Sequence, residues 1–445
     1  MKHFNLLIFF LIIFYSCHSS SQEHQKTASS TLLSINLSDE VTKKESLPLS
    51  NAVAKIDIVP LEVTDQSILG GINQVAVTSH DIWVSHYKKA FVYRFSREGK
   101  FLNKVGKIGQ GPGEYNRLSQ FFVNETQNEV YAVSIVNGIN IYDFEGNFKR
   151  KLTKLTLDDL FAAYDGKILL YNRTFFLSQN LPVMRPLTNP IDSLWSLAVT
   201  DSSFKIKKMF KNPVHKGREE MILKNRSKPE TFDAPNYWTE GPTNLDFYGN
   251  TFKIKYPDTD TIYRYDSVST HFQPVYTIRT TEEKGDYELT HVWIKERKAF
   301  DYFTIVGYYD TYKYIYLTGR KGKNIFTYQY DKENGKVEVT ERKGKFMEHK
   351  FPWFANPFLR LNCPFILTND LCGGHFHVKY RSNGKYWIDV LEYGTEDKWP
   401  DIQTIQKSEV KDEATRQKFL KVLNETGENS NPVLVIATLY PPLSH

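Results

Sequence analysis

The sequence YRFSREGKF at residues 93–101 recurs further along the chain as YDFEGNF at residues 142–148, with two residues fewer before the glycine. Each copy alternates as a β-strand does, enters a glycine turn and leaves it in a second strand. Gly99 and Gly146 lie 47 positions apart. This spacing is close to the roughly 40–50 residues of one four-stranded propeller blade. The pair therefore predicts a repeated all-β unit.

Similar strand pairs occur along the whole chain. Asn137-Gly138 separates two alternating runs and is typical of a tight hairpin, because both residues tolerate positive φ. Further units lie at residues 167–171 with 194–199, 261–266, 325–335 and 375–390. About six units predict a six-bladed β-propeller of four-stranded blades with long inter-strand insertions. Residues 54–61 and 433–439 are both strand-like, and we expect them to close the ring.

One helix is expected near the C-terminus, from Ser408 to Leu423. Ser408 is a suitable N-cap, acidic residues load the first turn, and Gly427 lies just beyond the end. The rest of the composition agrees with an all-β protein, since 14% of the 445 residues are aromatic and strands favour aromatic side chains.

Composition also excludes several classes of protein. A hydrophobic content of 40% with 24% charged residues excludes a polytopic membrane protein and a fully disordered chain. The formal net charge of +6 is small and dispersed, so no nucleic-acid partner is indicated.

The N-terminus has the pattern of an export signal. Lys2 and His3 precede a short apolar run that is followed by Ser16-Cys17. The run is too short to span a bilayer and predicts a signal peptide at residues 1–16. We expect Cys17 to be the lipidated N-terminus of an outer membrane lipoprotein, although it could be a chance cysteine beside an ordinary cleavage site. Residues 17–46 are expected to form a flexible tether, and residues 47–445 a single propeller domain.

A glycine-rich segment, GKIGQGPGEY at residues 106–115, resembles the signature of the six-bladed, NHL-like propeller lipoproteins of bacteria, which are mostly of unknown function. Residues 368–374 and 428–435 are similar to that family as well, and the resemblance covers residues 47–440. It implies a propeller outside the cytoplasm, periplasmic or facing the cell surface. The segment lacks a Gly-Lys-Ser/Thr ending and a following helix, so we expect a structural turn with Glu114 bonding backbone amides rather than a phosphate site.

Few residues have a pattern that predicts chemistry. His375 and His377 would point to the same face of a strand and are weak metal candidates, because a third ligand cannot be assigned. The other interpretation is a polar pair on a blade surface. No Gly-x-Ser-x-Gly elbow occurs in the chain, and neither a catalytic residue nor a cofactor is predicted.

Two cysteines remain once Cys17 is assigned. Cys363 and Cys372 would be able to form a disulfide in an exported protein, or both could be buried thiols. The sequence leaves both readings open.

Two classes of function remain. One is a non-catalytic binding or scaffolding lipoprotein, and the other is a propeller enzyme of the lyase or esterase type with a metal in its central channel. We favour binding of a protein or glycan through two insertions, residues 172–193 and 205–242, although both insertions could merely pad one edge of the propeller. The expected ligand-binding residues are Lys224, Arg226, Lys228, Tyr237, Trp238 and Asp370.

Overall fold

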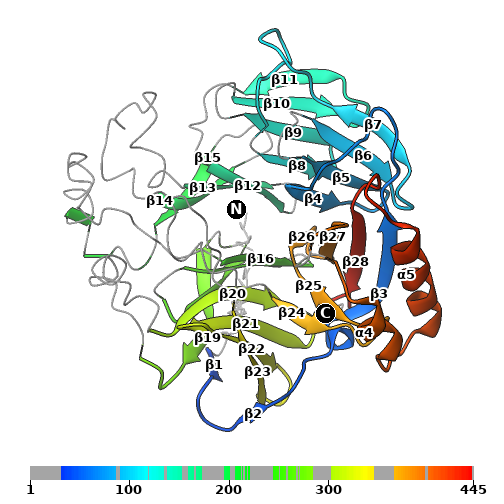
Figure 1. Cartoon of the computed structure of the whole chain (residues 1–445). Helices are drawn as coiled ribbons and strands as arrows, with labels where there is room; N and C mark the ends of the chain where they lie inside the picture. Colours follow the sequence, from blue (N-terminus) through cyan, green and yellow to red (C-terminus); the bar gives the residue numbers. More distant parts are fainter. Residues whose placement is uncertain are drawn as a thin grey trace, which may run out of the picture. The chain divides into compact units, whose positions relative to one another are not determined.

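A computed structural model describes residues 32–442 except for 87–90, 119, 135–137, 153–158, 165–166, 173–194, 201–205, 212, 214–215, 218, 221–243, 250, 257–258, 267–268, 270, 284–301, 345–364 and 396–398. The described strands form four sheets of four strands, two sheets of five strands and one sheet of two strands (Figure 1). Most side chains are described in five of the six larger sheets, whereas the sheet β12–β15 is described mainly by its backbone.

Three four-stranded sheets follow one another in the first half of the chain. The first contains β4 (Gln74–Val77), β5 (Asp81–Ser85), β6 (Val92–Ser96) and β7 (Phe101–Val105). The second contains β8 (Gln120–Asn124), β9 (Glu129–Ser134), β10 (Gly138–Asp143) and β11 (Phe148–Leu152). The third contains β12 (Asp159–Tyr164), β13 (Lys167–Asn172), β14 (Trp195–Thr200) and β15 (Ile206–Lys211).

The second half of the chain supplies the other sheets. One contains β16 (Asn244–Tyr248), β17 (Thr251–Lys255), β18 (Thr261–Asp266) and β19 (His271–Arg279). The next contains β20 (Thr304–Asp310), β21 (Tyr314–Lys321), β22 (Asn324–Asp331) and β23 (Val337–Lys343). The last large sheet contains β26 (Tyr380–Ser382), β27 (Tyr386–Leu391), β28 (Val433–Leu439) and β3 (Val53–Pro60). The two-stranded sheet is β24 (Ile366–Thr368) with β25 (His375–His377).

The order of the strands defines the fold. In the sheets that begin with β4, β8, β12, β16 and β20, consecutive strands lie side by side in chain order. The first strands of successive sheets contact one another, β4 with β8, β8 with β12, and β16 with β20, while β26 contacts β4. Four-stranded sheets that repeat around a central channel, with their first strands innermost, are the architecture of a β-propeller. The predicted all-β propeller with mostly four-stranded blades is therefore confirmed.

Residues 53–60 and 433–439 meet in one sheet, as the sequence predicts. β28 pairs antiparallel with β27 on one side and with β3 on the other, with Ile436 opposite Asp57. In Figure 1 the red β28 lies beside the blue β3. The C-terminal strand is thus an interior strand of this sheet, and closure by both ends removes an exposed edge.

The repeated glycine turns have the predicted role. Gly99 and Gly146 both adopt left-handed φ, +88° and +92°, at the turns that lead into β7 and β11. The amide of Gly99 donates to the carbonyl of Ser96 at 3.0 Å, and that of Gly146 to the carbonyl of Asp143 at 3.1 Å. A side chain at Gly99 would overlap the carbonyl oxygen of Pro60. Glycine is required there for conformation and for space.

The glycine-rich segment 106–115 is a structural turn between two sheets. The carboxylate of Glu114 accepts from the amide of Gly111 at 2.9 Å and pairs with Lys107 at 2.8 Å. The buried Tyr142 hydroxyl donates to the carbonyl of Gly113 at 2.6 Å. The expectation that Glu114 bonds a backbone amide in the turn is confirmed.

Two strands lie where the sequence predicts a flexible tether. β1 (Leu33–Asn36) pairs in parallel with β19, and β2 (Val41–Lys43) pairs in parallel with β23, which makes those two sheets five-stranded. The prediction of uniformly four-stranded blades is therefore wrong for both. Ile35 and Leu37 are buried in a cluster with residues of both sheets. Burial of these apolar side chains stabilises the packing of residues 33–43 on the two sheets. The compact unit therefore begins at Leu32 instead of at residue 47.

The predicted insertion and the predicted helix also need correction. Residues 206–211, expected to lie in an insertion, form the outer strand β15. The helix expected from Ser408 to Leu423 begins later, as α5 (Glu413–Glu425), and a second helix that was not expected, α4 (Ile402–Lys407), precedes it. Asp401 and Asp412 cap them, and Ser408 ends α4. Asp412 is the N-cap of α5 because its carboxylate accepts from the amide of Thr415 at 3.0 Å.

The core lies between neighbouring sheets. Its largest cluster joins β3, β27 and β28 to α5, and it also takes in the 3-10 helix η1 (Leu49–Asn51). Trp387 packs there against Tyr316 and Phe365, with ring centroids 5.9 and 5.4 Å apart. Among the described residues no helix has the length and hydrophobicity needed to cross a bilayer.

Candidate functional site

Three charged side chains lie on the first strands of three sheets. Asp246 belongs to β16, Asp310 is the last residue of β20, and Arg381 belongs to β26. These strands are the edges at which successive sheets meet, and in a propeller such strands surround the central channel. These three residues belong to one polar network at the inner edges of the sheets.

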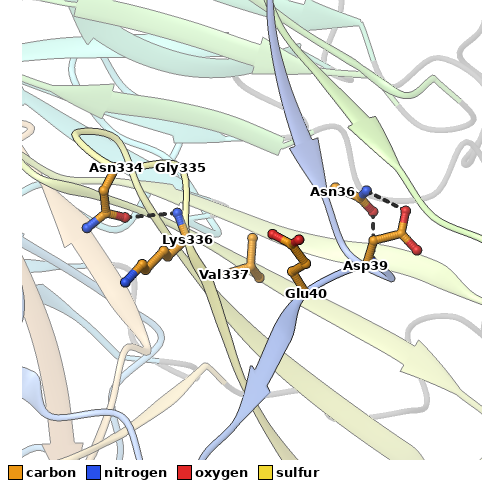
Figure 2. Close-up of a pocket in the computed structure, with 7 residues that line it drawn as sticks. All are labelled: Asn36, Asp39, Glu40, Asn334, Gly335, Lys336 and Val337. Carbon is orange, nitrogen blue, oxygen red and sulfur yellow. Dashed lines mark hydrogen bonds between the residues drawn. The ribbon is translucent and has the colours of Figure 1, made fainter.

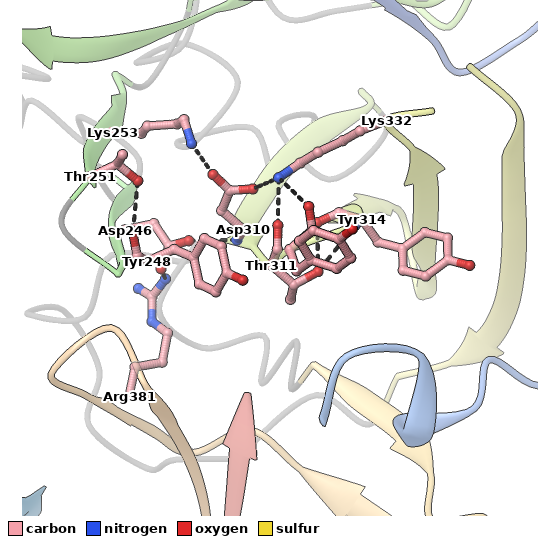
Figure 3. A network of polar contacts seen from close by, with 10 residues as sticks. Asp246, Tyr248, Thr251, Lys253, Asp310, Thr311, Tyr314, Lys332 and Arg381 are labelled. Carbon is pink, nitrogen blue, oxygen red and sulfur yellow. Dashed lines mark hydrogen bonds and ion pairs between the residues drawn. The ribbon is translucent and has the colours of Figure 1, made fainter. Parts of the chain in front are cut away.

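Asp310 is the centre of the site. Its carboxylate, with a side chain 1% exposed, forms ion pairs with Lys253 of β17 and with Lys332, which follows β22; the Lys332 pair measures 2.5 Å. The Lys332 ammonium group also donates to the carbonyl oxygen of Thr311 at 2.5 Å. Figure 3 shows both ammonium groups converging on one carboxylate.

Asp246 links this centre to the sheet of β26. Arg381 Nη1 donates to Asp246 Oδ1 at 2.6 Å and to the carbonyl oxygen of Tyr308 at 3.1 Å. The backbone amide of Asp310 donates to Asp246 Oδ2 at 2.5 Å. The guanidinium also lies over the ring of Tyr309, 4.9 Å from its centroid. Hydrogen bonds and ion pairs thus join three sheets through two carboxylates.

Burial and neighbouring charges set the protonation of the network. Burial raises the pKa of Asp246 to about 6, against the effect of Arg381 and with that of Asp310. Burial also acts to raise the pKa of Asp310, but Lys253 and Lys332 outweigh it and hold that pKa below its usual value. Burial lowers the pKa of Lys332 in spite of the neighbouring Asp310. Asp310 is therefore the firmly ionised acid of the network, and Asp246 is the one that titrates closest to neutral pH.

The arrangement is suited to holding strands together. The two oxygens of Asp310 each face an ammonium group, which makes this carboxylate a weak base. Removing one partner from a buried ion pair is costly, because the other charge is left in a medium that solvates it poorly. We call Asp246, Lys253, Asp310, Lys332 and Arg381 the inter-sheet charge network.

Asp370, the one expected ligand-binding residue that the structure describes, binds other parts of the chain. Its carboxylate accepts from the amide of Ser50 at 2.9 Å and pairs with Lys411 at 2.9 Å. It therefore joins η1 to the segment between α4 and α5. A role of Asp370 in ligand binding stays a prediction. Lys224, Arg226, Lys228, Tyr237 and Trp238 lie outside the described residues, as does Cys17.

The histidine pair lies on β25. His375 is exposed, whereas His377 is half-buried and its amide donates to Asp389 Oδ2 at 2.9 Å. Burial lowers the pKa of His377, and the charge of Asp389 opposes this. Within the part of the chain that the structure describes, no three side chains of His, Cys, Asp or Glu are grouped closely enough to hold a metal ion.

Cys372 is a buried thiol in the loop between β24 and β25. Asn369 Nδ2 donates to its sulfur at 3.1 Å, and burial raises the pKa of the thiol to about 12. Such a thiol is a poor nucleophile. Cys363 lies outside the described residues, so the disulfide stays a prediction.

A shallow pocket lies where β1 and β2 meet the turn between β22 and β23. Figure 2 shows Asp39 and Glu40 on one side and Lys336 on the other. Asn36 Oδ1 accepts from the amides of Ser38 and Asp39 at 3.0 and 3.2 Å, which fixes the bend between the two strands. The pocket is open, and its polar groups belong largely to the two turns that form it.

Sequence reasoning missed the inter-sheet charge network. Asp310 is 64 positions from Asp246, and Arg381 is 135 positions from Asp246. No local motif connects them. The signal available was weak: Lys253 and Lys255 alternate with Phe252 and Ile254 on β17, and both lysines are buried.

The fold and the site define the protein as a member of the β-propeller class, in which charged side chains lie buried between the inner strands. The profile of a family described as a domain of unknown function (DUF4934) matches residues 32–438. The chain therefore belongs to that family. A search of the curated proteins finds no significant match.

Solved structures show a likeness in fold. A protein of Bacteroides fragilis NCTC 9343, named as an exported protein, has a TM-score of 0.55 at 18% identity, with 92% of this chain and 100% of that chain covered. A member of the duf4221 family from Bacteroides vulgatus ATCC 8482 has a TM-score of 0.41 at 11% identity, covering 66% of this chain and 87% of that one. A streptogramin B lyase has a TM-score of 0.36 at 9% identity, covering 86% and 97%.

Proposed function

We propose that this protein is a membrane-anchored, extracytoplasmic propeller that binds a protein or glycan partner and does no chemistry. The observation that carries the proposal is the inter-sheet charge network. An enzyme of this fold would use the inner strands to present a base or metal ligands, and here Asp310 is committed to two lysines instead. The buried charges support rigidity, which leaves recognition to the loops.

The location rests on the N-terminal sequence and on one relative. Residues 1–16 have the pattern of a signal peptide and Cys17 that of a lipidation site. The Bacteroides fragilis protein of similar fold is named as exported. An outer membrane lipoprotein, periplasmic or cell-surface facing, fits both observations.

The binding site that we propose is the basic and aromatic segment with Lys224, Arg226, Lys228, Tyr237 and Trp238. Aromatic rings stack on sugars, and clustered cations favour acidic groups. The segment lies between β15 and β16, the last and first strands of neighbouring sheets. We also propose that the six sheets of four or five strands are six blades of one ring, of which this segment is an inter-blade connection.

Two variants test the proposal. Cys17→Ser should move the protein from the membrane fraction to the soluble fraction, and unchanged fractionation would contradict the anchor. Replacing Trp238 with Ala and the three basic residues with Ser should abolish partner capture from cell-envelope extracts with the melting temperature unchanged.

A matched control for the second variant replaces three exposed lysines elsewhere, Lys385, Lys407 and Lys418, with Ser. Capture should survive in this control. Capture at full strength by the Trp238 variant, or metal-dependent turnover of any ester or glycan by the purified protein, would overturn the proposed function.

A further inference from the structure

The outer strands of three successive sheets have the same unusual composition. These strands are β7 (FLNKV), β11 (FKRKL) and β15 (IKKMFK), and none of them contains an acidic residue. Each is the edge of its sheet, because the remaining strands lie on one side only. The three sheets are neighbours, since their first strands β4, β8 and β12 contact one another in that order. We call these three strands the basic rim.

Each strand of the basic rim exposes one large apolar side chain beside its cations. Leu102 of β7, Phe148 of β11 and Met209 of β15 are 47, 39 and 48% exposed. Leu102 and Lys104 are exposed, whereas Phe101 and Asn103 are half-buried. In β15, Met209 lies between Lys207 and Lys211, and all three are exposed. Exposed apolar residues interleaved with lysines are the composition of surfaces that lie at a membrane interface.

The charges of the rim are only partly neutralised by the protein. Lys149 and Arg150 pair with the buried Glu129, at 2.6 Å each. Among the described residues, no acidic side chain forms an ion pair with Lys104, Lys151 or Lys211. Lysines on edge strands also discourage edge-to-edge pairing of sheets, but that purpose does not call for an exposed Leu, Phe or Met on each strand.

The other sheets differ at their outer edges. β19 and β23 are covered by β1 and β2, and β3 is packed against α5. The cover of β19 begins at Leu32 and Leu33, which are themselves 48 and 41% exposed. β19 adjoins the rim, because its first residue His271 lies 3.2 Å from Lys208 of β15, from ring Nε2 to Nζ.

The start of the chain body therefore lies on a sheet that adjoins the basic rim. Leu32 lies fifteen residues after Cys17 in the chain, so fifteen peptide units link the two. Fully extended, they reach about 50 Å at most. A lipid at Cys17 would therefore hold the rim within reach of the headgroups, and one acyl-type anchor is strengthened by a second, basic contact.

We propose that the basic rim docks on an anionic lipid surface, with Leu102, Phe148 and Met209 entering the headgroup layer. This inference rests on the proposed membrane location. The rim would be a second contact with the membrane, separate from the lipid anchor and from the partner site at residues 224–238.

Vesicle binding by a chain without the anchor tests the rim alone. A chain that begins at residue 18, without the apolar run and Cys17, should bind vesicles of phosphatidylcholine with phosphatidylglycerol and should bind vesicles of phosphatidylcholine alone far more weakly. Lys104→Gln, Lys151→Gln and Lys211→Gln together should weaken binding about 100-fold, since each cation near an anionic surface contributes about a factor of five. Leu102→Ser with Met209→Ser should weaken it as well, and added salt should do the same to the wild-type chain.

The control for the charge variant removes Lys385, Lys407 and Lys418 by the same substitution, and its binding should be unchanged. Equal loss in both triple variants would overturn the rim as the docking surface. Two other results would overturn the rim as the docking surface. One is binding to a soluble acidic polysaccharide without binding to vesicles. The other is no vesicle binding together with aggregation of the Lys104/Lys151/Lys211 variant. Neither result bears on lipidation of Cys17, which the fractionation experiment tests separately.

Discussion

Asp310→Asn is the substitution that tests the inter-sheet charge network most sharply. It keeps the shape of the side chain and removes the charge that faces Lys253 and Lys332. Those two lysines have side chains only 11 and 20% exposed, so water would solvate the remaining charges poorly. Breaking a buried ion pair from one side costs about 3–5 kcal/mol. We expect a loss of that size in the free energy of unfolding.

The assay is urea denaturation followed by tryptophan fluorescence at neutral pH. Glu425→Gln is the matched control, because it breaks a 3.9 Å pair with Lys421 whose side chains are 65 and 73% exposed. Such surface pairs contribute about 0–1 kcal/mol. Adding Lys332→Met to Asp310→Asn should recover part of the loss, since it removes one of the two orphaned charges.

Alkaline pH provides a second readout of the same substitution. Burial already lowers the pKa of Lys332, and loss of Asp310 would remove the charge that opposes this. A base with a lowered pKa in the folded state favours folding as the pH rises and it loses its proton. The penalty of Asp310→Asn should therefore shrink towards alkaline pH. A penalty below about 1 kcal/mol, equal to that of the surface control, would refute the reasoning.

Three further predictions concern titration and packing. Asp246 has a pKa of about 6 in the folded chain and an ordinary value of 3.8, so its contribution favours folding below pH 4 and is lost as the pH rises through 6. Asp246→Asn should remove about 3 kcal/mol of that pH dependence from urea titrations between pH 4 and 7, and an unchanged slope would count against the buried position. A chain ending at Asn431 lacks an interior strand of its sheet and should melt at a clearly lower temperature; an unchanged melting temperature would argue against closure by β28 and β3. Gly99→Ala forces a side chain against Pro60 at positive φ and should cost more than about 1 kcal/mol, whereas Gly427→Ala, with open space around it, should cost less.

The propeller was predictable because its signals are local. Gly99 and Gly146 mark equivalent turns, and Asn137-Gly138 marks a hairpin, and each depends only on neighbouring residues. The strand-like segments at residues 54–61 and 433–439 also predicted their own pairing. Alternation along a strand shows which residues are buried in a sheet, although it does not show which sheet is next to it.

The first strands of the body could not be predicted in the same way. Residues 33–38 alternate apolar and polar side chains as a short strand does, but they directly continue a polar segment, and the predicted tether included both. Their order depends on Ile35 and Leu37 entering a cluster built by sheets more than 200 residues away. The local alternation does not show which sheet such a strand joins.

The inter-sheet charge network could not be predicted from the sequence either. Asp246 and Arg381 lie in the middle of short strands and Asp310 at the end of one, and each looks like an ordinary polar residue in the sequence. Their proximity follows from the way the inner strands of three sheets meet, and the sequence does not state which strands those are. The helix boundary is different: Ser408 was the predicted cap, whereas the carboxylate of Asp412 caps α5 by accepting from the amide of Thr415.

Photo-crosslinking in living cells tests the central claim, that the chain is a binding module and that the segment 224–238 is its recognition surface. A photoreactive residue at Trp238 should give one covalent adduct of discrete mass with a cell-envelope protein or glycan. The same residue at Lys418, exposed on α5, should give none. An adduct at both positions, or at neither, would contradict the account.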